Sequence, residues 1–151
     1  MNLVDFFSFF FHTSLFILTW VIQLVIYPTF LDTEGDVHRS SHTRYIKRAS
    51  VIALPLMFGQ LVLSIFAWFQ HSTVIDTLIV AFVAVIWVVT LFFALPAHQK
   101  VNDSRRETME EDLKSLRRWH SIRSTSWTAI WLLDVAQYLR SHLQGTSVAV
   151  G

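Results

Sequence analysis

Seven histidines stand in a chain of 151 residues that contains no cysteine. Three of them, His42, His98 and His120, lie shortly before or after long apolar stretches. Neutral imidazole is a common side-chain ligand for zinc, copper, iron and nickel. A catalytic zinc site uses three protein ligands, so these residues are candidate metal ligands, with His38 as a fourth. The alternatives are a haem held by two histidines, an organic or anionic ligand without a metal, and rings that only hydrogen-bond to backbone or lipid head groups.

Arg123, Tyr27 and two glutamines add polar groups within or beside the same apolar stretches. A planar guanidinium binds anionic groups well, and a tyrosine hydroxyl can donate a hydrogen bond. Gln23 and Gln60 must find partners inside the protein, because lipid offers none. These amides either join neighbouring helices or form the floor of a pocket beneath the histidines. The candidate residues are Tyr27, His98 and Arg123 for catalysis, Gln23, Gln60 and His120 for cofactor binding, and His42, His98 and His120 for metal binding.

His12 and Asp134 are ionisable residues inside the first and the last apolar stretch. An ionisable group within a membrane segment is a functional candidate whose partner should be named. His12 lies roughly two turns from the start of its stretch, and Asp134 lies about one to two turns from the end of its own. Their equal depth predicts a hydrogen-bonded pair. Such a pair would either relay protons or lock the first helix to the fourth.

Four long helices are the elements that must position these groups. The segments 6–31, 51–70 and 77–97 contain no Asp, Glu, Lys or Arg. At about 1.5 Å per residue, each is long enough to cross a hydrocarbon layer of about 30 Å. The fourth segment, 121–139, contains one arginine and one aspartate, and we expect it inside a bundle that shields them. The first segment is too long for the apolar core of a signal peptide and follows no positive charge, so we expect it to be retained.

The basic residues predict the orientation of these helices. Of the 12 Lys and Arg residues, all but Arg140 fall in the segments 32–50 and 98–123. The positive-inside rule places these segments in the cytoplasm and both termini outside. The short turn 71–76 then faces outside. With this orientation, one level at the cytoplasmic side of the membrane collects Tyr27, His42, His98, His120 and Arg123.

The two cytoplasmic segments are expected to contain helical pieces. Ser104 and Glu107 have the spacing of a capping box, which marks a helix start. An apolar stripe at i, i+4 and i+7 follows from Met109, on an otherwise charged segment. This pattern predicts an amphipathic helix that runs toward the fourth span, either docked on a partner or simply solvated. We also expect helix after Gly35.

Several short motifs in this chain resemble those of a family of small bacterial four-helix membrane proteins, most of them uncharacterised. The motifs are Trp20-x-x-Gln23-x-x-x-Tyr27-Pro28, His42 with Arg44, Pro55 with a polar residue five positions on, Ile86-Trp87, Pro96-x-His98, and Ile122-Arg123-Ser124 before Trp127. The resemblance covers roughly Trp20 to Trp127 and implies a four-helix membrane bundle. That family is in turn loosely similar to anthrone-oxygenase-like membrane proteins.

This chain departs from the family's pattern at five positions. Where the family has a Glu in its second helix this chain has Gln60, and where it often has an Arg after the last Trp this chain has Ile130. These two replacements agree with each other, because losing one charge of a buried pair strands the other. Ala94, His120 and Ser121 stand where the family has Gln, Asn and Trp. An activity that requires the Glu is therefore not expected here.

We therefore predict an all-α fold: a single domain, 1–151, that forms an antiparallel four-helix bundle in a bacterial inner membrane, which it crosses several times. The first functional hypothesis is a membrane enzyme or ligand-binding protein with a cytoplasm-facing His/Tyr/Arg pocket for a transition metal, a haem or a small lipophilic substrate. Oxidoreduction is the expected chemistry if a metal is bound. The cofactor itself is left unidentified.

The second hypothesis is a non-enzymatic accessory subunit of a larger membrane complex, whose exposed aromatic residues would pack on a partner protein. The third hypothesis is a transporter. Four helices without internal repeats leave little room for a transport path unless the chain forms a homo-oligomer. The expected partners are the lipid bilayer and either another membrane protein or further copies of the chain. Nucleic-acid binding is not expected, because membrane topology explains the distribution of basic residues.

Overall fold

The structure, a computed structural model, describes residues 3–31, 36–103 and 108–148. Within these ranges it leaves out the side chains at 30–31, 36–43, 102–103, 109–110 and 141–148. All regular structure in the described part is helical, with no strand: α1 (Leu3–Val21), η1 (Ile22–Ile26), α2 (Tyr27–Leu31), α3 (Asp36–His71), α4 (Val74–Val89), η2 (Thr90–Ala94), α5 (Leu95–Asp103) and α6 (Met109–Val148).

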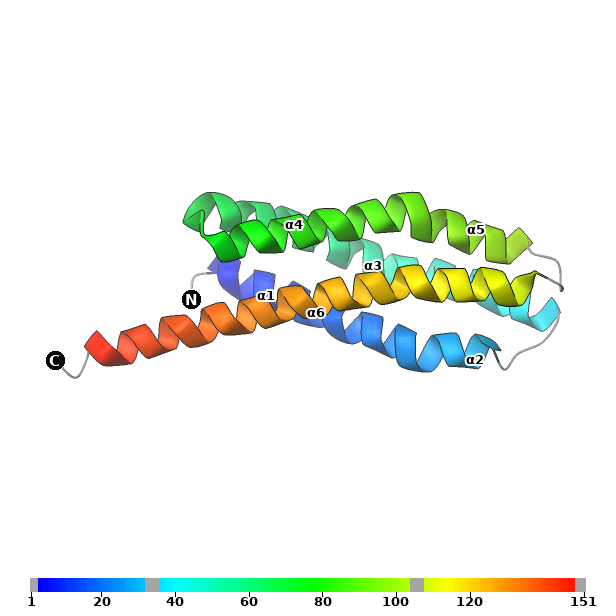
Figure 1. Ribbon diagram of the computed structural model, residues 1–151, viewed down its shortest axis with the longest axis horizontal. Coiled ribbons are helices and arrows are strands. Elements are labelled where there is room, and N and C mark those ends of the chain that lie inside the picture. Colours follow the sequence, from blue (N-terminus) through cyan, green and yellow to red (C-terminus); the bar gives the residue numbers. More distant parts are fainter. Residues whose placement is uncertain (1–2, 32–35, 104–107, 149–151) are drawn as a thin grey trace.

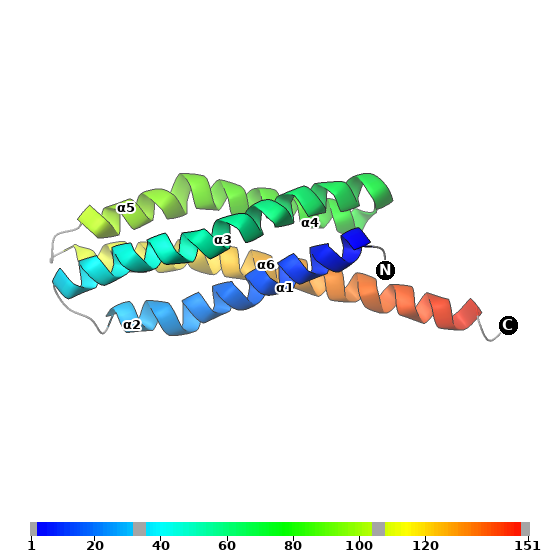
Figure 2. The ribbon, with the colours of Figure 1, turned by 180° about the vertical axis from the view of Figure 1, so that it is seen from behind.

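These segments join into four long rods that lie side by side, as Figures 1 and 2 show from opposite sides. The rods are α1–η1–α2, α3, α4–η2–α5 and α6, where η1 and η2 are short π-helical segments. The first rod packs on α3 and α6, and α4 packs on the same two helices, which makes a closed bundle. The predicted all-α four-helix architecture is therefore confirmed.

The two ends of the bundle differ in what they carry. Both termini and the α3–α4 turn lie at one end, which we call the terminal end (Figure 1). The end of α2, the start of α3, the end of α5 and the start of α6 lie at the other, which we call the basic end because the neighbouring sequence holds most of the Lys and Arg residues. Successive rods thus run antiparallel, as predicted.

Three helical stretches are long and apolar enough to cross a membrane: Leu3–Thr29, Arg44–His71 and Val74–Val101. They contain the first three predicted spans almost entirely. Within the described residues α6 does not meet the same criterion, so the crossing predicted at 121–139 remains a prediction.

Two helices are longer than the predicted elements that they contain. α6 joins the predicted amphipathic loop helix and the predicted fourth span into one helix of 40 residues. No Pro or Gly interrupts it between 109 and 144, so nothing in the sequence ends the helix there. α3 likewise runs through the expected helix after Gly35 and continues past Pro55. The predicted capping box of Ser104 and Glu107 lies outside the described residues.

The α3–α4 turn is short because both of its helices are capped. Ser72 has a φ of 50°, the left-handed conformation that commonly ends a helix, and its amide donates to the carbonyl of Trp68 at 2.8 Å. Thr73 and Asp76 form a capping box at the start of α4, in which each side chain accepts from the other's backbone amide at 3.2 Å.

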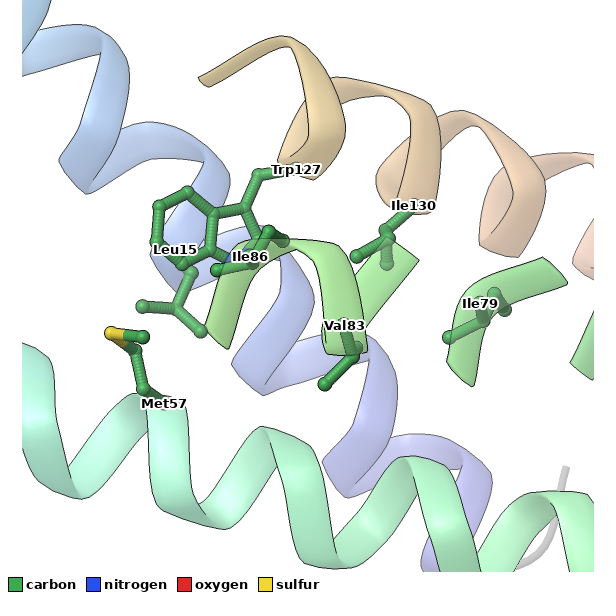
Figure 3. Close-up of a cluster of buried hydrophobic side chains, with 7 residues drawn as sticks. All are labelled: Leu15, Met57, Ile79, Val83, Ile86, Trp127 and Ile130. Carbon is green, nitrogen blue, oxygen red and sulfur yellow. The ribbon is translucent and has the colours of Figure 1, made fainter. Parts of the chain in front are cut away.

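The centre of the bundle is an apolar cluster to which all four rods contribute. Figure 3 shows its side chains pointing toward one another: Leu15, Met57, Ile79, Val83, Ile86, Trp127 and Ile130. The outer surface is also apolar, with Phe10, Phe69 and Phe92 among its exposed side chains. Extended exposed apolar surface is a mark of membrane or protein contact.

Candidate functional site

A partly open cavity of about 100 Å³ lies at the basic end of the bundle. One wall is the face of α3 from Tyr45 to Leu54, and the opposite wall is the segment from Thr90 to His98. Side chains of η1, α2 and α6 close the back. The polar lining consists of Tyr27, Tyr45, Ser50, Thr90, His98, His120 and Arg123. We call this space the basic-end cavity.

Both π-helical segments lie at the level of this cavity. Ile22 begins η1, and Thr90 and Ala94 begin and end η2; all three line the cavity. A π-helical turn within an α-helix is rare and is frequently found at functional sites. The two irregular turns therefore mark the same place as the polar side chains.

His120 is fixed in one orientation by its neighbours. It is 4% exposed, and its Nδ1 lies 3.2 Å from Gln23 Oε1 and 3.2 Å from Ser124 Oγ. The Gln23 amide nitrogen in turn donates to Ser121 Oγ at 2.9 Å, which assigns Oε1 as the atom that faces the ring. Because that oxygen only accepts, the ring proton of a neutral His120 belongs on Nδ1, and Nε2 keeps its lone pair. Tyr27, 3% exposed, packs edge-on against the ring at 5.0 Å between centroids.

Arg123 contributes a cation that has no carboxylate partner among the side chains that the structure describes. Its guanidinium lies 5.0 Å over the ring of Trp127, and Nη2 contacts Met57 Sδ at 3.8 Å. Tyr27 and Tyr45 are near enough to interact with it electrostatically. Its Nε is buried without a hydrogen-bond partner, and no carboxylate among the described residues forms an ion pair with it. A charge that is held away from water is strongly unfavourable unless a group of opposite charge binds beside it.

The structure brings four of the predicted site residues to one cavity: Tyr27, His98, His120 and Arg123. His98 lies within electrostatic range of His120. The side chain of His42, the third predicted metal ligand, lies outside the described residues. Among the side chains that are described, no group of three His, Asp or Glu residues is placed to hold a metal. Metal binding therefore stays a prediction that depends on His42.

The two glutamines do not line the cavity and instead join helices. Gln23 stands behind His120 and links η1 to α6 through the bonds described above. Gln60 lies deeper, 0% exposed, where its Oε1 accepts from Trp127 Nε1 at 3.1 Å. The helix-joining alternative thus describes both residues, and their predicted part in cofactor binding stays a prediction.

The sequence reading missed Tyr45 and the small residues of α3. Ala49, Ser50 and Ala53 line the cavity on the same face of α3 as Tyr45. The signal was present, because Tyr45, Ala49 and Ala53 recur at intervals of four and so share one face of a helix. The π-helical segments have no comparable sequence signal.

A second, smaller polar site lies at the terminal end. His12 Nδ1 and Asp134 Oδ2 are hydrogen-bonded, which confirms the predicted pair, and His12 Nε2 lies 3.1 Å from Ser64 Oγ. A cavity of about 40 Å³ borders these residues, together with Asp5 and Asp76. The space is enough for a few water molecules.

Comparison of the chain with protein-family models, with curated proteins and with solved structures finds no match. The function must therefore be argued from the site itself.

Proposed function

We propose that this chain is an integral membrane protein that binds a small molecule with an anionic group in the basic-end cavity. The observation that carries the proposal is Arg123, a half-buried residue that lines the cavity without a carboxylate partner among the described residues and whose Nε is buried. An ionisable residue inside a membrane bundle marks a substrate or ion site by default. Carboxylate and phosphate groups fit the planar fork of a guanidinium.

The other polar residues have roles that follow from their chemistry. Tyr27 would donate a hydrogen bond to the anion held by Arg123. Nε2 of His120 and the ring of His98 would accept protons from the bound molecule, which is how a membrane enzyme would use this site. We place the cavity at the cytoplasmic face of a bacterial inner membrane, because the positive-inside rule assigns the basic end to that side.

The test is calorimetric titration of the detergent-purified protein with benzoate, a small anion, and with benzamide, its neutral counterpart. The cavity, at about 100 Å³, is smaller than the apolar cavities of about 150 Å³ that accept benzene, but it is partly open. The carboxylate of benzoate would therefore enter the cavity and part of the ring would stay outside it. We expect benzoate to bind at one site and benzamide to bind at least tenfold more weakly, a difference of about 1.4 kcal/mol. Arg123→Gln should weaken the binding of benzoate by a similar factor. Arg117→Gln, at an exposed position on the same helix, should leave benzoate binding unchanged.

The proposal fails if benzoate does not bind, or binds no better than benzamide. Absence of binding combined with co-purification of a larger membrane complex would support the accessory-subunit hypothesis instead.

A transition metal is a second candidate occupant, favoured by the proximity of His98 and His120 at one cavity. Two imidazoles are fewer than the three protein ligands of a catalytic zinc site, so His42 would have to complete it. Elemental analysis and an absorption spectrum of the purified protein test this candidate. A metal that is lost in His98→Ala, with helicity unchanged, supports it, and a metal-free protein with no haem absorption excludes it.

A further inference from the structure

Two exposed leucines are among the residues that line the basic-end cavity. Leu54 on α3 and Leu95 on α5 both line the cavity, and they are 53% and 46% exposed on the outside of the bundle. Between them and the back of the cavity, the α3 wall is built of small residues, Ala49, Ser50 and Ala53. The cavity is partly open, and we take the space between these leucines and small side chains as the gap through which it reaches the outer surface.

This opening lies within the apolar length of the helices, short of their ends. Leu54 is ten residues inside the stretch Arg44–His71, about 15 Å along the helix axis, and Leu95 is six residues inside Val74–Val101, about 9 Å. Each stretch of 28 residues is about 42 Å long and exceeds a hydrocarbon layer of about 30 Å by roughly 6 Å at each end. In a bilayer, both leucines would therefore contact hydrocarbon.

The polar groups that could hold a charged group include the two most buried polar side chains of the lining, His120 and Tyr27, which are 4% and 3% exposed. Arg123 and His120 come from α6, behind the gap between α3 and α5, and Tyr27 stands beside them. A molecule with a charged group at Arg123 would therefore direct its other end past Ala53 toward Leu54 and Leu95. The space of about 100 Å³ accommodates a head group and the first carbons of a chain, and it is too small for a whole two-chain lipid.

We propose that the ligand is a single-chain amphiphile with an anionic head group, which enters sideways from the bilayer through the gap between α3 and α5. The head group binds Arg123, and the chain leaves through the gap into lipid. This inference rests on the proposed anion-binding function and adds the class of ligand and its route of entry. A water-soluble anion would instead enter past the half-buried polar side chains Tyr45, Ser50 and His98, and butanoate tests that route.

The experiment is native mass spectrometry of the full chain, released from neutral detergent, with three probes added in turn. Hexadecanoate has both the charge and the chain, butanoate has the charge alone, and hexadecan-1-ol has the chain alone. We expect one saturable hexadecanoate adduct, with at least tenfold weaker binding of the other two probes. Arg123→Gln and Ala53→Phe, which fills the gap, should each weaken hexadecanoate at least tenfold.

The matched controls are Arg117→Gln and Ala84→Phe, at exposed positions of α6 and α4, and both should bind hexadecanoate as the parent chain does. Thermal unfolding monitors the fold of each variant, and Ala49→Leu replaces Ala53→Phe if the latter does not fold. Equal binding of butanoate and hexadecanoate, with no effect of Ala53→Phe, would overturn the lateral route while anion binding stands. Equal binding of hexadecanol, or no binding of any probe, would overturn the proposed function as well.

Discussion

His12 of α1, which is buried, and Asp134 of α6, which is half-buried, form a hydrogen-bonded pair between residues that are 122 positions apart in the sequence. Ser64 of α3 contacts the other ring nitrogen of His12 at 3.1 Å, so three of the four rods meet at one imidazole. The rest of the bundle is joined mainly by apolar packing, and these bonds fix the register of α1 against α6.

We predict that the two residues are strongly coupled in stability. His12→Leu and Asp134→Leu should each lower the free energy of unfolding by about 3–5 kcal/mol, because the first leaves the half-buried Asp134 carboxylate and the second leaves the buried Nδ1 of His12 without its partner. The double variant should lose less than the sum, with a coupling of about 1–3 kcal/mol. Unfolding in mixed micelles, followed by circular dichroism, measures all three values.

The control for this cycle is Asp5→Asn, which removes the half-exposed pair of Asp5 with His71. Its effect should stay below about 1 kcal/mol, since exposed ion pairs contribute little. Strictly additive effects of the two leucine substitutions would show that the pair does not lock α1 to α6.

The effect of substituting Trp127 on the free energy of unfolding should depend on whether the buried amide of Gln60 is present. Its Oε1 accepts from Trp127 Nε1, whereas its Nε2 is buried and has no hydrogen-bond partner in the described part of the chain. Trp127→Phe would leave the whole amide unsatisfied, so we expect a loss of about 1–3 kcal/mol beyond the effect of packing. In the background of Gln60→Leu, where there is no amide to strand, the same substitution should be less damaging. Equal effects of Trp127→Phe in both backgrounds, measured by the same unfolding assay, would contradict this account.

The contact between Gly59 and Phe11 should limit side-chain size where α1 meets α3. A Cβ at Gly59 would collide with Cε1 of Phe11 and lie 2.9 Å from Cζ. Gly59→Val should therefore lower the free energy of unfolding by about 1–3 kcal/mol through overpacking. Adding Phe11→Leu should recover part of this loss. As a control, Ala84→Val, on the exposed face of α4, should change the free energy of unfolding of the parent chain by less than about 0.5 kcal/mol. Failure of Phe11→Leu to recover any stability would locate the strain elsewhere.

The sequence predicted those features of the fold that depend on length and depth alone. Uncharged blocks predicted three long helices, and the constant rise of a helix placed His12 and Asp134 at equal depth. The same reasoning brought Tyr27, His98, His120 and Arg123 to one end of the bundle. In each case the inference needed only the order of the rods and the position along them.

Features that depend on rotation about a helix axis could not be predicted in this way. Gln23 and Gln60 lie at suitable depths for a pocket floor, yet their side chains point to Ser121 and Trp127 rather than into the cavity. The π-helical turns η1 and η2 also rotate the face of each helix that points into the bundle, and no residue pattern in the sequence predicts these turns. The sequence therefore predicted the level of the site better than its lining.

The orientation of α6 in a membrane is the prediction on which the proposed function most depends. The chain has no cysteine, so single cysteines can be introduced at Ser72, Ser115 and Arg140, three exposed positions, without removing any native one. Ser115 and Arg140 are 25 residues apart on one helix, about 37 Å, which exceeds the hydrocarbon thickness of about 30 Å. A membrane-impermeant maleimide should label Ser72→Cys and Arg140→Cys from the periplasmic side, and Ser115→Cys only in inverted vesicles. Labelling of Arg140→Cys and Ser115→Cys from the same side would mean that α6 does not cross, and Arg123 would then lie outside the hydrocarbon, where a guanidinium requires no anionic ligand.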